Sequence, residues 1–167
     1  MRVSQIRKLI IPVLIFGFAV SPVFAANNSK KSNLRYVIKN DTVFDKKTEL
    51  TWQRCSVGQH WKKGVGCAGI IQTFTFTQAQ HLGDEKWRVP TKEELSSLID
   101  PKRSADNQVP AVDNDAFPDM DSNNLSYWSS TTDGVVGGWY VPFDGAPAYT
   151  SSLTSATFAV RLVRNGK

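Results

Sequence analysis

The sequence predicts an α+β domain made mostly of short strands, with two short helices and long loops. In the C-terminal third, apolar and polar residues alternate, as in TFAVRLVR at 157–164, which is typical of strands with one buried face. Two short segments, at 77–83 and 91–100, each begin with a threonine that can cap a helix. Between 101 and 124 the chain is polar and rich in turn-forming residues, which indicates a long loop.

The N-terminus is typical of a cleaved signal peptide, residues 1–25. It starts with three cations, continues with an apolar run at 9–20, and ends in small residues that suit cleavage after Ala25. The alternative is a retained membrane anchor, which needs about 20 apolar residues. The run here is shorter and contains Pro12 and Gly17, so we expect export, to the periplasm, the cell surface or the medium, and no membrane span in the mature chain.

Removal of residues 1–25 changes the charge of the protein. The formal charge of +5 falls to +2, because 17 cations then face 15 carboxylates. A strongly basic chain would favour nucleic acid as a partner, whereas a charge of +2 does not, so we expect no nucleic-acid partner. The remaining length suits one domain, which we place at 34–167 after a flexible polar leader at 26–33.

The mature chain begins with strand signals. The segment RYVIK at 35–39 predicts a short strand, and TVFDKKTELTWQR at 42–54 predicts two strands joined by the turn at 45–48. Leu50 and Trp52 fall on the same face of the second strand. This pattern predicts a hairpin with a buried tryptophan.

Two cysteines, Cys55 and Cys67, enclose the glycine-rich segment SVGQHWKKGVG. In an exported chain they are expected to pair, and a disulfide closing a loop of this size stabilises a fold by about 3 kcal/mol. Metal binding and redox chemistry are the alternatives, but the spacing is not Cys-x-x-Cys and no nearby residues complete a zinc site. We therefore expect a structural disulfide that closes a surface loop.

The first helix is expected after an alternating segment, TFTFT at 73–77. Thr77 can cap the short apolar-polar segment QAQHL at 78–82, and Gly83 can end it. This predicts a single short helix between the cysteine loop and residue 87.

The second helix is expected in WRVPTKEELSSLID at 87–100. Thr91 occupies the N-cap position and Glu94 lies three residues later, as a capping box requires, while Pro101 is expected to end the helix. Arg88 could serve a site, but an arginine beside a tryptophan more often packs its stem and pairs with a carboxylate or a carbonyl. The residues expected on the buried face are Leu95, Leu98 and Ile99.

After the predicted loop at 101–124 the chain returns to strands. YWSSTT at 127–132 and GWYVPF at 138–143 predict two strands, and Asp144-Gly145 predicts a turn. The closing strand at 157–164 places three apolar side chains on one face, Phe158, Val160 and Leu162.

Several phrases in a fixed order resemble the family typified by the C-terminal domain of the Legionella collagen-like protein. The phrases are DKKTELTWQR, WRVPTKEELSSLID, PAVDNDAFP, YWSSTT, GWYVPFDG and AVRLVR. They run from Asp45 to Arg164. The resemblance implies a C-type-lectin-like fold, also similar to formylglycine-generating enzymes, with a small, twisted, mostly antiparallel sheet. It further implies an exported bacterial domain, in some relatives an adhesion module, and in one type a binder of sulphated glycosaminoglycans.

The resemblance also assigns roles to particular residues. The family has no established family-wide catalytic residues, so none is carried over. The positions that match its pattern are interpreted as fold determinants: Trp52, Trp87, Arg88, Pro90, Glu94, Leu95, Tyr127, Trp128 and Ser129. Ligand specificity is expected in the cysteine loop and in the loop at 101–126.

Catalysis requires a positioned nucleophile, acid, base or metal. The two histidines are His60 and His81, and a triad of Ser129 or Ser130 with His81 would lack a Gly-x-Ser-x-Gly elbow. We therefore expect no enzyme. An exported enzyme distantly related to formylglycine-generating enzymes remains the alternative, and it would depend on His81 or Ser129.

A cluster of acidic residues follows the second helix. Asp119, Asp121 and Asn123 imitate the start of a calcium loop, in which oxygen ligands alternate along the chain. Asn124 and Ser130 stand where such a loop needs glycine and glutamate. Calcium is a weak candidate, and we expect no cofactor.

The best candidate ligand residues lie in the cysteine loop. His60, Trp61, Lys62 and Lys63 combine an aromatic face with cations, which suits a sugar or an anionic glycan, and Lys102 and Arg103 are candidates to extend this patch. The alternative is that Trp61 packs on the core and the lysines are merely solvated. We expect a non-catalytic exported module that binds a glycan or a protein at a cell surface or envelope; a structural envelope component is a further alternative. The sequence does not specify the ligand or the oligomeric state.

Overall fold

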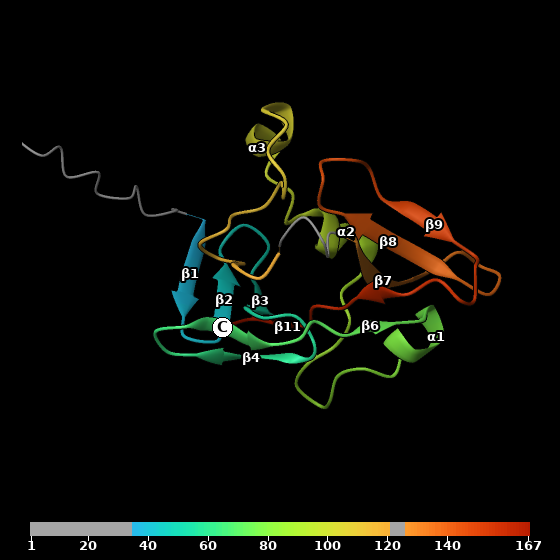
Figure 1. The fold of residues 1–167 in the computed structure, drawn as a ribbon, viewed down its shortest axis with the longest axis horizontal. Coiled ribbons are helices and arrows are strands. Elements are labelled where there is room, and N and C mark those ends of the chain that lie inside the picture. Colours follow the sequence, from blue (N-terminus) through green and yellow to red (C-terminus); the bar gives the residue numbers. More distant parts are fainter. Residues whose placement is uncertain (1–34, 121–125) are drawn as a thin grey trace, which may run out of the picture. The chain divides into compact units, whose positions relative to one another are not determined.

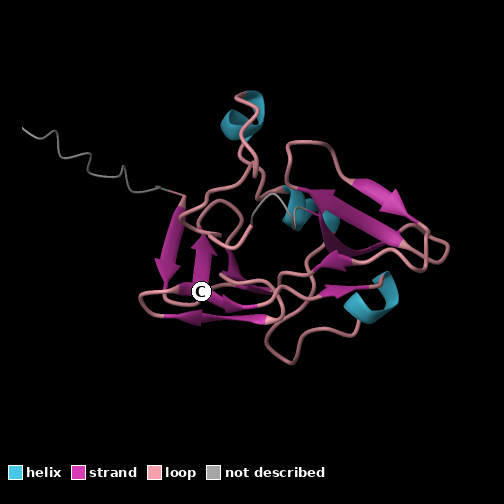
Figure 2. Ribbon diagram, viewed as in Figure 1, coloured by secondary structure: helices cyan, strands magenta, loops and turns pink. Residues whose placement is uncertain are grey.

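The computed structural model describes residues 35–120 and 126–167, which form a mixed α+β fold (Figures 1 and 2). The strands are β1 (Tyr36–Lys39), β2 (Thr42–Asp45), β3 (Leu50–Gln53), β4 (Gln59–Lys62), β5 (Gly66–Gly69), β6 (Thr73–Phe74), β7 (Ser126–Thr132), β8 (Gly138–Pro142), β9 (Tyr149–Ser151), β10 (Phe158–Ala159) and β11 (Val163–Asn165). The helices are α1 (Phe76–Ala79), α2 (Lys92–Ser96) and α3 (Pro101–Ala105). The predicted α+β class and its strand-rich character are confirmed.

The strands form two sheets and a separate hairpin, not one sheet. The first sheet has the order β1-β2-β3-β11 and is antiparallel, while the second has the order β6-β10-β7-β8-β9. In the second sheet β10 runs parallel to β7, and the other pairings are antiparallel. Strands β4 and β5 pair only with each other. The predicted hairpin at 42–54 is confirmed as β2 and β3.

The closing segment joins the two sheets, because β10 belongs to the second and β11 to the first (Figure 1). Its alternation, predicted from the sequence, is confirmed. Phe158, Val160 and Leu162 pack in a cluster around Trp128. Ala159 and Val163 face the other way and pack in the larger cluster that contains Trp52 and Tyr127. The segment therefore has two buried faces, each with its own core.

The first helix begins two residues earlier than predicted. Thr75, not Thr77, is the N-cap: its hydroxyl accepts from the Gln78 amide, and the Gln78 side chain accepts from the Thr75 amide. Both threonines have a glutamine three residues later, so the cap signal alone is ambiguous. The choice follows from packing, because Phe76 lies edge-on to the buried Trp128 ring, with centroids 5.4 Å apart.

A third helix replaces part of the loop predicted at 101–124. Pro101 does not end structure but begins α3, because Asp100 acts as its N-cap and accepts from the amides of Lys102 and Arg103. Proline suits the first position of a helix, where its missing N–H removes no hydrogen bond. Helix α2 ends earlier, at the C-cap Ser97. The expectation of two helices was wrong for this reason.

The capping box predicted in the motif at 87–100 is confirmed, although α2 ends earlier than predicted, at Ser96. Thr91 caps α2 and forms the reciprocal capping box with Glu94. Arg88 donates from both terminal nitrogens to Glu94, at 2.7 Å each, and also to Asn165. These hydrogen bonds lower the pKa of Glu94. Arg88 thus ties α2 to the end of β11, which is the structural role expected of it.

Arg161, on the segment between β10 and β11, is a fully buried charged residue. Its side chain and that of Asp119 are almost completely buried, and Nη2 lies 2.5 Å from Oδ1. The guanidinium also donates to the backbone carbonyls of Gln53 and Arg54 and to the Ser56 hydroxyl. One buried pair therefore connects three segments distant in sequence.

Candidate binding site at the disulfide hairpin

The cysteine loop is a hairpin closed by the predicted disulfide. Cys55 and Cys67 are bonded, with their Cα atoms 5.5 Å apart, which confirms the pairing. The segment between them contains β4 and the first residue of β5, and Trp61 lies directly opposite Cys67 in the pairing. The two strands of this loop were not predicted, because its apolar residues do not alternate regularly.

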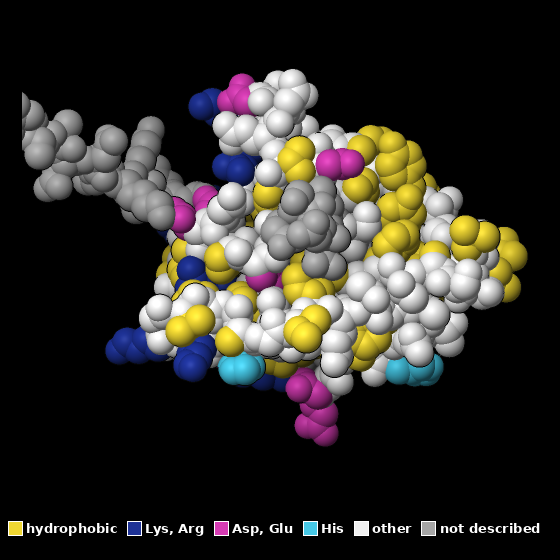
Figure 3. All heavy atoms as spheres, viewed as in Figure 1, with side chains coloured by type: hydrophobic (Ala, Val, Ile, Leu, Met, Phe, Trp, Pro, Cys, Tyr) yellow, Lys and Arg dark blue, Asp and Glu magenta, His cyan; other side chains and the backbone are white. Residues whose placement is uncertain are grey.

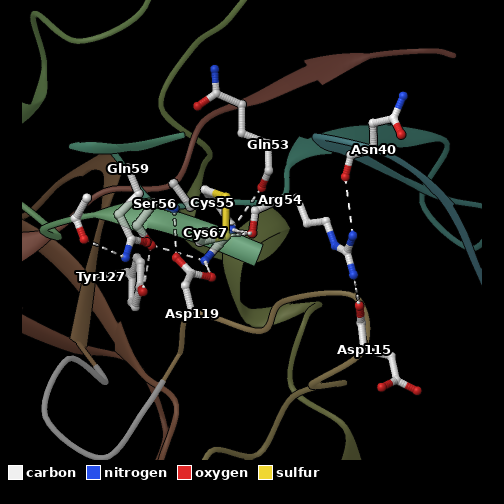
Figure 4. The surroundings of a disulfide bond; sticks show 12 residues. Asn40, Gln53, Arg54, Cys55, Ser56, Gln59, Cys67, Asp115, Asp119 and Tyr127 are labelled. Atoms are coloured by element: carbon white, nitrogen blue, oxygen red, sulfur yellow. Dashed lines mark hydrogen bonds and ion pairs between the residues drawn. A yellow bond between two sulfur atoms is a disulfide. The ribbon is translucent and has the colours of Figure 1, made fainter. Parts of the chain in front are cut away.

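The neck of the hairpin is hydrogen-bonded to Asp119, the buried partner of Arg161 (Figure 4). Ser56, next to Cys55, donates its amide to Asp119 Oδ2 at 2.7 Å, and its hydroxyl lies 2.8 Å from the Tyr127 hydroxyl. Burial alone would raise the pKa of Asp119, but the charge of Arg161 and the hydrogen bonds from Ser56 and Arg161 outweigh it and hold the pKa below its usual value. The carboxylate is therefore charged at neutral pH and fully engaged.

Trp61 is half-buried and is held from one side. The Arg54 guanidinium carbon lies 3.7 Å from the centre of its ring. Arg54 is itself fixed, because it donates to the backbone carbonyls of Asn40 and Asp115 (Figure 4). The stacking stabilises this orientation of the ring.

The same ring lines a hollow that opens beside the disulfide. Trp87 lines it as well, so two partly exposed tryptophans from separate segments meet there. The other lining residues are Asp41, Gln53, Cys55, Gln59 and His60. The hollow thus combines aromatic rings with carboxylate, amide and imidazole groups.

Trp87 also borders a second hollow, on the side of Arg88 and Arg164. Its ring centre lies 5.5 Å from the Arg164 guanidinium carbon and 5.9 Å from Lys86 Nζ. The remaining lining residues are Asp84, Glu85, Lys86, Arg88, Arg164 and Asn165. The two hollows therefore meet at Trp87.

The predicted ligand residues do not all lie together. His60 and Trp61 line the first hollow, and Lys62 and Lys63 are exposed at the turn end of the same hairpin. Lys102 and Arg103 belong to α3, where they line a different, largely acidic hollow with Asp100, Asp106, Asp113 and Asp115. Figure 3 shows dark blue side chains both at the hairpin side and at the α3 side of the view, well apart. The structure thus brings the hairpin residues together and separates them from the α3 pair.

Of the residues considered for calcium and for catalysis, Asp119 and Ser129 form structural hydrogen bonds. Both Asp119 oxygens are hydrogen-bonded, while Asp121 and Asn123 lie outside the described residues. Within 35–120 and 126–167, no group of three or more His, Cys, Asp or Glu side chains is placed to hold a metal. Ser129 is buried and donates its hydroxyl to the Trp139 carbonyl at 2.7 Å.

Sequence reasoning missed two kinds of residue at this site. Trp87 was interpreted as a fold determinant, and Asp41, Gln53 and Gln59 were not singled out, because they join the hollow only through the pairing of distant strands. Arg161 carried one signal, a charge between apolar residues in a segment expected to be buried. Its partner, 42 positions away, had no such signal.

The fold and the hairpin together define a small, disulfide-stapled α+β domain with aromatic-lined hollows on its surface. A family model, described as the Lcl C-terminal domain, matches residues 41–164, most of the chain, and the protein belongs to this family. Searches of the curated proteins and of the solved structures gave no significant match. Within its described part, the chain has no helix that is long and apolar enough to cross a membrane. Family and disulfide are both compatible with an exported protein.

Proposed function

We propose that this protein is an exported, non-catalytic binding module that recognises a surface glycan through the hollow between Trp61 and Trp87. The observation that supports this most directly is the meeting of two partly exposed tryptophans with Asp41, Gln59 and His60 in one hollow. Aromatic faces pack against the apolar faces of sugar rings, and a few polar groups then fix the orientation through the hydroxyls. The C-type-lectin-like fold expected from the family resemblance is part of this proposal.

The geometry around Trp61 suits binding without rearrangement. Arg54 stacks on the ring and is held by two backbone carbonyls, and the disulfide closes the hairpin that carries the ring. A site that is rigid before binding loses less conformational entropy when a ligand arrives. Lys62 and Lys63, exposed at the end of the hairpin, would favour a glycan that carries sulphate or carboxylate groups.

The test is binding of residues 26–167 to a panel of neutral and sulphated glycans at physiological salt, with calcium and with chelator. Trp61→Ala should weaken binding by about tenfold, as expected for the loss of one stacked ring and its apolar contact area. Trp139→Ala is the matched control: that ring is also partly exposed but lies on β8, outside the hollow, so its removal should leave affinity unchanged.

The charge of the ligand is tested separately. If sulphated glycans bind without calcium, replacing Lys62 and Lys63 with alanine should weaken their binding and spare that of neutral glycans. A signal that appears only with calcium would move the site to the acidic segment around Asp119. No binding in either condition would refute the glycan proposal and leave a protein partner as the best remaining candidate.

A further inference from the structure

A further hollow lies on one face of the first sheet, and neither Trp61 nor Trp87 lines it. A row of four side chains crosses the sheet there, because Val37 pairs with Phe44, Phe44 with Thr51, and Thr51 with Arg164. All four line a hollow of about 180 Å³, together with Lys39, Thr42 and Lys167. Its floor is apolar at the β1 end, since Val37 and Phe44 are neighbours in this row.

The rim of this hollow is cationic. Lys39, Arg164 and Lys167 line it, and Lys167 Nζ lies 5.1 Å from the centre of the Phe44 ring. None of the lining residues has a carboxylate side chain. The neighbouring Asp45 is buried and bound by Arg35, so its charge is already compensated. The positive charge at the rim is therefore not balanced by a carboxylate side chain within the hollow.

Arg164 also has a nitrogen without a partner. Its Nε is buried and has no acceptor in the described part of the chain, and Nη1 makes only a long contact, 3.4 Å, with the Asn165 carbonyl. The guanidinium is positioned by the Trp87 ring, 5.5 Å away. A buried N–H that lacks an acceptor is unfavourable, and such groups in native proteins usually have a bound water, ion or ligand.

We propose that this hollow binds a carboxylate carried on a compact apolar group such as a phenyl ring. A planar carboxylate matches the geometry of a guanidinium and would accept hydrogen bonds from Arg164. The ring would lie on Val37 and Phe44, where it replaces water over an apolar surface. A volume of about 180 Å³ is comparable to that of an apolar cavity of about 150 Å³ that binds benzene, so a phenyl ring suits the size of the hollow.

The experiment is an NMR titration of the protein, expressed from its full sequence with the predicted signal peptide and isolated after export. The probe is 3-phenylpropanoate, compared with 3-phenylpropanol, which lacks the charge, and with propanoate, which lacks the ring. We expect saturable shifts at Val37, Phe44 and Arg164 and a Kd on the order of 1 mM, the range for so small a ligand. Each comparison compound should bind at least about fivefold more weakly, because it lacks one of the two interactions.

Variants separate this site from the rest of the surface. Arg164→Gln should raise the Kd by about tenfold or more through loss of the charge-assisted hydrogen bonds. Lys46→Gln is the matched control, since that exposed lysine follows β2 but lies outside the hollow. This substitution should leave the Kd of 3-phenylpropanoate unchanged. If Arg164→Gln fails to fold, Lys39→Gln tests the positive charge of the rim and Phe44→Leu tests the aromatic floor of the hollow. Each should weaken the binding of 3-phenylpropanoate.

Several results would overturn the proposal. They are the absence of saturable shifts, equal affinity for the alcohol or for propanoate, and unchanged affinity in Arg164→Gln. Trp61→Ala should leave 3-phenylpropanoate binding intact, because that ring lies in another hollow. Failure of the glycan proposal and failure of this one are therefore distinguishable.

Discussion

Replacing Asp119 with alanine should be among the most destabilising single changes in this protein. The substitution leaves the Arg161 guanidinium, 0% exposed, without its counter-charge. Breaking a buried ion pair by removing one partner costs about 3–5 kcal/mol. The Ser56 amide loses its acceptor as well, and an unsatisfied buried N–H costs about 1–3 kcal/mol, although the two effects overlap. We expect a loss of about 3–5 kcal/mol, a large part of the 5–15 kcal/mol typical of a domain.

Urea unfolding at pH 7, followed by tryptophan fluorescence, measures this loss. Asp119→Asn keeps an acceptor for the Ser56 amide and removes only the charge, so it separates the two contributions. Glu93→Ala is the control, because its pair with Lys92 is exposed and should contribute nothing measurable. A loss below about 1 kcal/mol in Asp119→Ala would refute the reasoning, since it would mean that water or relaxation compensates the guanidinium.

The pH dependence of stability provides an independent check. The pKa of Asp119 is lower in the folded protein than its usual value, despite burial, which by itself raises it. The stabilisation from this group is therefore complete above the unfolded-state pKa of about 3.9 and is lost as the pH falls through the lower folded-state pKa. Asp119→Asn should lose this acid-dependent component, so its stability should fall less steeply than that of the wild type below about pH 4.

Three further changes test other parts of the structure. Replacing Cys55 and Cys67 with serine should lower the free energy of unfolding by about 3 kcal/mol, and an unchanged denaturation midpoint would contradict the role of the disulfide. Thr91→Ala should cost about 1 kcal/mol through loss of the α2 cap, with Thr91→Ser near neutral in the same unfolding assay. Gly138→Ala should destabilise by about 1–3 kcal/mol, because its Cβ would lie 2.0 Å from the Phe76 ring, and a wild-type melting temperature would show that the ring moves away freely.

Features encoded by neighbouring residues were predictable from the sequence. The cap of α2 at Thr91 needs only a glutamate three residues later, and the hairpin of β2 and β3 needs only two apolar-polar runs and a short turn. The alternation at 157–164 also gave the correct faces. Each of these signals acts within a few positions of the chain, so it needs no knowledge of the tertiary contacts.

Features that depend on distant contacts were not predictable in the same way. Threonines at 75 and 77 have equal cap signals, and only the packing of Phe76 on Trp128 selects the first. The division into two sheets depends on the segment after β10 crossing between them, which no local pattern specifies. The hollow beside the disulfide is a further example, because its two tryptophans are brought together by the fold and not by their spacing.

The arrangement around Trp61 divides the candidate site into a fixed and an adjustable part. Arg54 holds the ring through carbonyls of the β1–β2 turn and of the segment at 115, and the disulfide fixes the neck of the hairpin, so the ring position depends on three distant segments. The lysines at 62 and 63 lie instead at the glycine-containing turn, exposed and without an ion pair in the described part of the chain. A change in the turn would alter the charge presented to a ligand without moving the ring. For a glycan, affinity should therefore follow the tryptophan, and preference between neutral and anionic sugars should follow the turn.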